Sequence, residues 1–140
     1  MKASKKDFFE ESEVLLEEAE RLLLEIQETS SAEINPDTIN ALFRSIHTIK
    51  GISGIFDFRE ITDFSHSFES LLDDIRLGRV GLTEEAVRFL FRNLDFLAKI
   101  IREREAKGAQ DVFGFIQAIE SFRTSAGACS DSSRIEALMQ

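Results

Sequence analysis

Apolar residues recur at three- and four-residue steps along most of the chain, the spacing that places them on one face of an α-helix. Strand-like alternation of apolar and polar residues is hard to find. The pattern predicts four long helices, and the residues before each one are typical of a helix start. These start signals are Ser4 with Asp7, Asn35-Pro36-Asp37, Asp57 with Glu60, and Thr83 with Glu84 and Glu85. Gly78 and Gly108 are predicted to end the third and fourth helices.

A shorter fifth helix is predicted from about Asp111 to Phe122. Because long helices joined by short loops pack as antiparallel neighbours, we expect an all-α fold. The expected architecture is an antiparallel four-helix bundle with an additional C-terminal fifth helix, occupying residues 1–123 as one domain. Residues 124–140 begin with the small and polar run TSAGACSDSS, so we expect a flexible linker or tail there.

All aromatic residues of the chain are phenylalanines, 13 in number, and most stand at helical spacing among Leu and Ile. This placement indicates core packing. Phe8, Phe9 and Phe58 lie near predicted helix ends, and the pattern leaves open that some of them face a partner instead.

The charge of the chain excludes several functions. Its 140 residues carry a net charge of -9, which argues against binding nucleic acid or an anionic membrane surface. Cys129 is the only cysteine, so neither an internal disulfide nor a thiolate zinc cluster is expected. No apolar run approaches the ~20 residues of a membrane span. The start of the chain turns acidic within ten residues and lacks the apolar segment of a secretion signal. We therefore expect a cytoplasmic protein.

One edge of the second predicted helix carries polar residues and glycines beside the apolar face. Arg44, His47 and Gly51 follow this edge, and Lys50 lies slightly nearer to the core. Gly51 and Gly54 are poor helix formers, each costing ~1 kcal/mol relative to Ala. They either leave room for a molecule to approach His47 or simply weaken the end of the helix.

The third predicted helix has a matching polar edge that includes His66 and Glu69. If the second and third helices pack antiparallel, the two edges share a groove, and Glu69 is placed to accept a hydrogen bond from His47. A carboxylate that holds one imidazole nitrogen fixes the tautomer and makes the other nitrogen a better nucleophile.

Other chemistries find less support in the sequence. A serine triad lacks a nucleophile elbow, and no glycine-rich phosphate loop is present, so we expect no cofactor and no ATP site in this chain. A metal site from His47, His66 and Glu69 is conceivable from these residue types, although the Glu-x-x-His pairs of di-iron bundles are missing. A nucleophilic imidazole beside an ammonium, on an exposed edge, suits the transfer of a phosphoryl group between proteins.

The run His47-Thr48-Ile49-Lys50-Gly51-Ile52-Ser53-Gly54-Ile55-Phe56 resembles the histidine-containing phosphotransfer (HPt) domain, as does the later block His66-Ser67-Phe68-Glu69-Ser70-Leu71-Leu72-Asp73. It is most similar to the HPt domains at the amino terminus of chemotaxis histidine kinases. The resemblance implies that His47 accepts the phosphoryl group, with Lys50 beside it. It also implies that Glu69 orients the imidazole and that His66 belongs to the same hydrogen-bonded cluster. Arg44, Gly51 and Gly54 then give surface access near the site.

Two glycines of the family pattern are replaced here, by Ile52 and by Asp57. Ile52 is expected to point away from His47, and Asp57 is expected to cap the third helix, so neither departure touches the proposed chemistry.

The resemblance implies a phosphohistidine carrier in two-component signalling. Its expected partners are a histidine kinase catalytic domain, which binds ATP and Mg²⁺, and the receiver domain of a response regulator. It also implies a monomer when isolated, with no enzymatic activity of its own and with a larger kinase as its natural setting. The alternative from a different class is a non-catalytic helical adaptor in which His47 is incidental.

Overall fold

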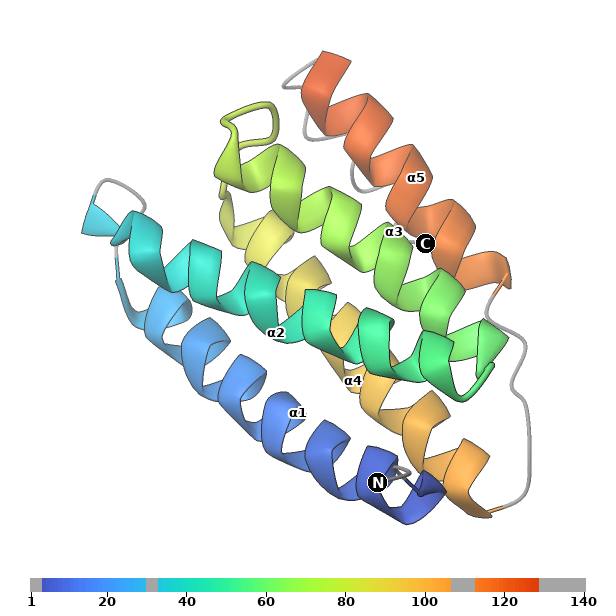
Figure 1. Cartoon of the computed structure of the whole chain (residues 1–140). Coiled ribbons are helices and arrows are strands. Elements are labelled where there is room, and N and C mark those ends of the chain that lie inside the picture. Colours follow the sequence, from blue (N-terminus) through green and yellow to red (C-terminus); the bar gives the residue numbers. More distant parts are fainter. Residues whose placement is uncertain (1–3, 30–32, 107–112, 129–140) are drawn as a thin grey trace.

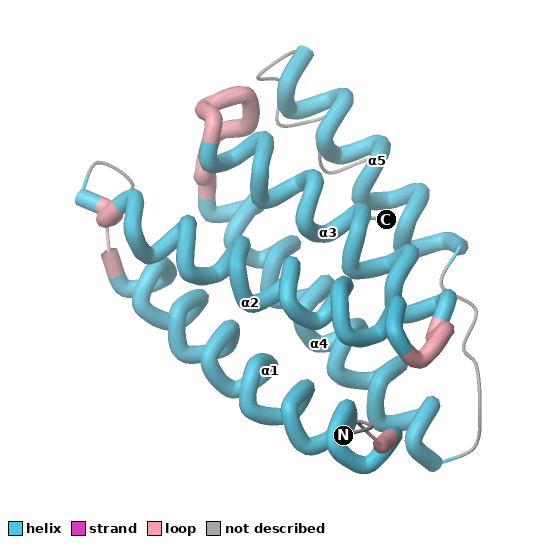
Figure 2. Tube along the Cα trace, in the orientation of Figure 1, coloured by secondary structure: helices cyan, strands magenta, loops and turns pink. Residues whose placement is uncertain are grey.

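The computed structural model describes residues 4–29, 33–106 and 113–128 of the chain. These residues form five helices and no strands (Figures 1 and 2). The helices are α1 (Lys5–Glu28), α2 (Pro36–Ile55), α3 (Arg59–Arg76), α4 (Glu84–Ala106) and α5 (Phe113–Ala128). Within the bundle α2 packs against α1 and α3, and α4 packs against the same two helices. Helix α5 packs against α3, outside the bundle (Figure 1). The predicted all-α bundle with a fifth helix is confirmed.

Three of the four predicted start signals act as expected. Ser4 and the side chain of Asp7 form a reciprocal capping box at the start of α1. The side chain of Asn35 accepts a hydrogen bond from the backbone N–H of Asp37 at 2.9 Å, and Pro36 occupies the first turn of α2. The Thr83 hydroxyl accepts a hydrogen bond from the backbone N–H of Ala86 at the start of α4.

The prediction that Asp57 caps the third helix is wrong. Asp57 has a φ of 58°, and Phe58 occupies the capping position without any side-chain cap. The left-handed region disfavours residues with a Cβ and is open to glycine, with Asp among the more tolerant exceptions. Where the resemblance implies a glycine, this chain therefore has an aspartate in a conformation that glycine adopts without cost.

Burial of an aromatic ring fixes the start of α3 in place of a cap. Phe58 is 2% exposed, and its ring contacts Phe8, Phe9 and Phe56 with centroid distances of 5.0–5.9 Å. Phe8 and Phe9 are buried as well. The core interpretation therefore holds for the three phenylalanines near helix ends, and none of them is exposed for a partner.

Gly78 ends α3 with a φ of 79°, as predicted, whereas Gly108 and Asp111 lie outside the described residues. The predicted boundary at residue 124 does not end the fifth helix, because α5 continues to Ala128. Ile119 and Phe122 are buried, and Arg123 donates a hydrogen bond to Asp74 of α3 at 2.6 Å. These contacts hold α5 against α3 up to Arg123. Because adding residues to an existing helix is much easier than starting one, the helix continues for one more turn through small residues. Residues 129–140 of the predicted tail lie outside the described residues.

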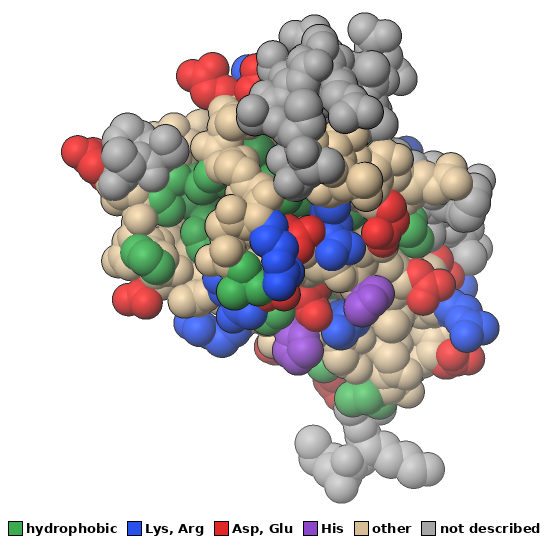
Figure 3. All heavy atoms as spheres, turned by 90° about the horizontal axis from the view of Figure 1, so that it is seen from above, with side chains coloured by type: hydrophobic (Ala, Val, Ile, Leu, Met, Phe, Trp, Pro, Cys, Tyr) green, Lys and Arg blue, Asp and Glu red, His purple; other side chains and the backbone are tan. Residues whose placement is uncertain are grey.

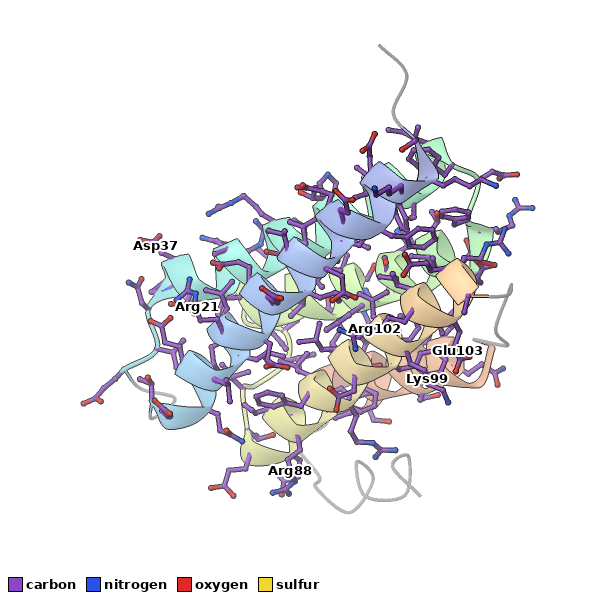
Figure 4. The ribbon with its side chains drawn as sticks, turned by 90° about the horizontal axis from the view of Figure 1, so that it is seen from below. Arg21, Asp37, Arg88, Lys99, Arg102 and Glu103 are labelled. Atoms are coloured by element: carbon purple, nitrogen blue, oxygen red, sulfur yellow. The ribbon has the colours of Figure 1, made fainter. Side chains whose placement is uncertain are left out.

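Helices α1 and α4 are also joined at their surface by an ion pair. Arg102 of α4 donates two hydrogen bonds to the carboxylate of Glu13 on α1, at 2.8 and 3.0 Å, and Figure 4 shows Arg102 on the side of α4 near α1. In the described part of the chain, no helix is both long and apolar enough to cross a membrane.

Candidate functional site

His47 lies on the exposed side of α2, just outside the apolar stripe that packs into the core. Its neighbours Ile46 and Ile49 are fully buried, whereas the His47 side chain is 59% exposed. Figure 3 shows both histidines of the chain on one face of the molecule, with basic and acidic side chains close by. The imidazole of His47 is therefore accessible to another protein while its backbone is held by a rigid helix.

Glu69 of α3 holds the His47 ring from the adjacent helix. The distance from His47 Nδ1 to Glu69 Oε2 is 2.6 Å, and the Glu69 side chain is only 13% exposed. Because a carboxylate only accepts hydrogen bonds, Nδ1 carries a proton in this contact. In the neutral ring the lone pair then lies on Nε2. The predicted contact between Glu69 and His47 is present.

Lys50 completes the contacts of this carboxylate. Its Nζ donates a hydrogen bond to Glu69 Oε1 at 3.0 Å, and its side chain is 24% exposed. Each oxygen of Glu69 thus has one partner from α2, one turn apart along that helix. The ammonium and the imidazole are brought together by a single, largely buried negative charge.

Gly51 and Gly54 leave open surface next to this cluster. Apart from the adjacent residues and the backbone of α2 itself, a Cβ built at either position would have no atom within 4 Å, so no other part of the described protein covers them. A shallow groove runs beside them between α2, α3 and α5. Its lining residues are Lys50, Gly51, Gly54, Thr62, Asp63, His66, Ser67 and Ile116.

His66 lies in this groove and not in the hydrogen-bonded cluster. Among the described residues the His66 ring makes no hydrogen bond, whereas His47, Lys50 and Glu69 are joined. The structure therefore places His66 near Lys50 on the approach to the site. Asp73, one turn beyond Glu69, bonds to Arg76.

Two residues of the site were not identified by the sequence pattern. Phe43 counted only as part of the apolar stripe, but its ring lies parallel to the His47 ring, with 8° between the planes and 6.0 Å between centroids. The guanidinium of Arg76, from the end of α3, lies 4.4 Å from the centre of the Phe43 ring. The spacing of Phe43 and His47, four residues apart on one helix, is a signal from which this contact could have been found.

Arg44, one turn before His47, is exposed, and no ion pair of its side chain occurs in the described ranges. The metal site considered from His47, His66 and Glu69 is not supported, because no group of three His, Cys, Asp or Glu residues suitable for a metal ion occurs in the described part of the chain. The arrangement provides one exposed imidazole nitrogen with a lone pair, the carboxylate of Glu69 at the other nitrogen, and the cationic side chains of Lys50 and Arg44 one turn away on either side along α2.

Similar proteins were found among characterised sequences. The chain is 33% identical to the chemotaxis protein CheA of Rhizobium meliloti (strain 1021) over 111 residues, which cover 79% of this chain and 14% of that protein. It is 30% identical to the chemotaxis protein CheA of Treponema pallidum (strain Nichols) over 131 residues, covering 92% of this chain and 16% of that protein. The chain therefore corresponds to a small part of the length of these relatives.

Two solved structures share the fold. One is the solution structure of the histidine phosphotransfer domain of CheA, with a TM-score of 0.69 and 24% identity, covering 82% of this chain and 87% of that one. The other is the phosphorylated P1 domain of CheA3 in complex with CheY6 from R. sphaeroides, with a TM-score of 0.74 and 22% identity, covering 89% and 96%. A family model described as "Hpt domain" matches residues 4–107. Because this match includes α1 to α4 and the polar edges of α2 and α3 that meet at Glu69, the chain belongs to the HPt domain family.

Proposed function

We propose that this chain is a phosphohistidine carrier in a chemotaxis phosphorelay. His47 accepts a phosphoryl group from ATP held by a histidine kinase catalytic domain and passes it to an aspartate of a response regulator. The observation that carries the proposal is the contact of His47 Nδ1 with Glu69 at 2.6 Å on a ring that is 59% exposed. This contact leaves Nε2 as the free nucleophile.

In the first step the Nε2 lone pair attacks the γ-phosphorus of ATP. An N–P bond forms, the bond from phosphorus to the bridging oxygen breaks, and ADP leaves with that electron pair. Positive charge develops on the imidazole as the N–P bond forms, and the carboxylate of Glu69 at Nδ1 stabilises it. In the second step an aspartate oxygen of the regulator attacks phosphorus, and the N–P bond breaks to return the neutral ring.

Cations near His47 favour the transferred group, which is an anion. Lys50 is bound to the same carboxylate as His47, so its ammonium stays close to the reacting ring. Arg44 is exposed one turn before His47, and a guanidinium is well suited to phosphoryl oxygens. We assign both residues to charge stabilisation during transfer.

The groove beside Gly51 and Gly54 is the proposed route for partner proteins. An N–P transfer requires the partner's phosphate or carboxylate to come within bonding distance of Nε2, and bulky side chains next to His47 would hold it away. The absence of contacts at both glycines supports this route. The solved complex of a related P1 domain with CheY6 supports a response regulator as one of the partners. His66 then lines the path of the incoming protein.

We further propose that ATP and Mg²⁺ bind to the kinase domain and not to this chain. The sequence contains neither common type of glycine-rich phosphate loop. The relatives are about six to seven times longer than the region that this chain matches, which leaves room in them for such a domain. In this setting the chain acts in the cytoplasm, and as an isolated domain it is a monomer. A non-catalytic adaptor would have no need of the shared contacts of Glu69, so we do not adopt that alternative.

The test is transfer of ³²P from labelled ATP by the isolated kinase domain of a CheA protein. We expect labelling of the intact chain and of His66→Gln, which removes the other histidine of the same face, and no labelling of His47→Gln. The label should be stable in base and lost in acid, as a phosphoramidate is. It should then pass to a receiver domain. Label retained by His47→Gln would overturn the proposal.

A further inference from the structure

We propose that Phe43 and Arg76 form a positioning pair that sets the orientation of the His47 ring. Phe43 has no polar atom for a phosphoryl group, and the guanidinium of Arg76 is engaged by Phe43 and Asp73, so we assign to both an action through His47. This inference rests on the proposed function for its effect on transfer, while the geometry itself is testable without any transfer reaction.

The hydrogen bond to Glu69 restrains the imidazole of His47 at one edge only. Together with the Cβ–Cγ bond this contact limits rotation of the His47 ring, but it leaves the faces of the ring without support. The face of the ring is restrained by Phe43, whose plane lies within 8° of parallel at a centroid distance of 6.0 Å. Because 59% of the His47 side chain is exposed, these two contacts carry much of the restraint on the ring.

Arg76 holds Phe43 from the neighbouring helix. Its guanidinium lies 4.4 Å from the centre of the Phe43 ring, a distance suited to a cation–π contact. Both Nε and Nη2 of Arg76 donate to Oδ1 of Asp73, which keeps the guanidinium in place over the ring. The long side chain of Arg76 is thereby immobilised by one acceptor on its own helix.

One restraint on His47 comes directly from α3, and the other, from Phe43 on α2, is supported by α3. Glu69 acts directly on the edge of the ring, and Arg76 acts through Phe43 on its face. With the edge and the face both defined, Nε2 has one direction in which its lone pair points. An in-line attack on phosphorus depends on that direction, so loss of the pair should slow the transfer step more than it weakens binding of the partner.

The chain offers a matched control for Arg76. Arg104 of α4 lies 4.8 Å from the centre of the Phe58 ring and also pairs with a carboxylate, that of Glu60. Arg104→Gln thus removes the same kind of contact as Arg76→Gln, but next to a phenylalanine that is not in contact with His47.

The first readout is the NMR spectrum of the His47 ring in the unphosphorylated protein. Removal of an aromatic neighbour changes the ring-current contribution to the His47 Hδ2 and Hε1 shifts. We expect Phe43→Leu to move both shifts, Arg76→Gln to move them in the same direction by a smaller amount, and Phe43→Tyr to leave them close to those of the intact chain. Arg104→Gln should leave them unchanged.

The second readout is the rate of phosphorylation by a CheA kinase domain. We expect Phe43→Leu to lower kcat about three- to tenfold and Arg76→Gln about two- to fivefold, with KM nearly unchanged. In the double variant, Arg76→Gln should add almost nothing to Phe43→Leu, because it acts through the ring that is already missing.

Unmoved His47 shifts in Phe43→Leu, or fully additive effects in the double variant, would overturn the inference. Failure of the proposed function gives a different result: no label would reach His47 in the intact chain, while the NMR shifts would still show whether Phe43 and Arg76 orient its ring. The two ideas therefore fail separately.

Discussion

Replacing Glu69 by glutamine tests the mechanism at the atom where the structure places it. The substitution keeps the size of the side chain and removes its charge. In the intact chain Oε2 faces His47 Nδ1 and Oε1 faces Lys50 Nζ, so both oxygens accept. A glutamine has only one acceptor oxygen for these two donors. If that oxygen turns to the ammonium, the amide NH₂ faces Nδ1, and the ring must carry its proton on Nε2, where it blocks the nucleophile.

The magnitude follows from the charge that is lost. Two unit charges ~4 Å apart interact by ~1 kcal/mol in water and ~4 kcal/mol at an effective dielectric constant of ~20. The site lies between these limits, because Glu69 is 13% exposed and His47 is 59% exposed. At ~1.4 kcal/mol per factor of ten, phosphorylation should slow by about ten- to a thousandfold, and the exposure of the imidazole favours the lower part of this range.

The assay is the rate of ³²P transfer from a CheA kinase domain, together with ¹⁵N NMR of the His47 ring. We expect the intact chain to show the tautomer with a proton on Nδ1, and Glu69→Gln to show a larger share of the other one. Helical circular dichroism should not change, since the buried apolar face of α3 is untouched. Glu60→Gln is the control, because Glu60 is on the same helix, equally buried at 12% exposure and paired with Arg104. An unchanged rate together with an unchanged tautomer in Glu69→Gln would refute the mechanism.

Three further substitutions have distinct expected outcomes. Lys50→Ala should slow transfer about tenfold with unchanged circular dichroism, because Glu69 loses a charge-assisted partner while the core is untouched. An equal loss of helical signal and of transfer rate would mean that Lys50 has a structural role instead. Gly51→Ala should raise the free energy of unfolding by about 0.5–1 kcal/mol, since its Cβ meets no atom, and yet slow transfer to a receiver domain. Glu13→Gln should lower the free energy of unfolding at pH 7 by less than ~1 kcal/mol. The hydrogen bond from Arg102 holds the pKa of Glu13 below its ordinary value of 4.5, so this contribution is present above that pH and is lost in acid, and the urea curves of the two proteins should converge as the pH falls below that value.

The sequence was sufficient for features that depend on local spacing. The helices follow from the apolar period, and the caps at Ser4 and Asn35 follow from residue types within one turn. The contact of His47 with Glu69 could also be predicted, because two polar edges on successive antiparallel helices can pair in few other ways.

Features that depend on contacts between distant segments were missed. Aspartate is a residue type that often caps helices, but the burial of Phe58 against Phe8 and Phe9 determines the backbone conformation at Asp57 instead. The end of α5 was placed too early, because its small residues resemble a linker and nothing local shows that Arg123 is anchored to Asp74. Both errors arise where tertiary packing overrides local preference.

The chemistry of the site depends on the register between α2 and α3. The nucleophile and the ammonium lie on α2, while the carboxylate that holds them lies on α3. A shift of one helix by a single turn is ~5.4 Å, far more than a hydrogen bond tolerates, and it would bring Asp73 or His66 opposite His47 in place of Glu69.

That register is set at the turn between the two helices. The Phe58 N–H donates to the carbonyl of Ser53 at 3.0 Å, and the Ser53 and Thr62 hydroxyls are 2.8 Å apart across the two helices. The ring of Phe58 is held in the aromatic cluster at the start of α1. Since Glu69 lies only about three turns beyond Phe58 on a rigid helix, a cluster remote from the imidazole determines which side chain reaches it. The left-handed backbone conformation of Asp57 allows the chain to reverse its direction in so short a turn. The site therefore depends on the backbone conformation at this position more than on the identity of its side chain.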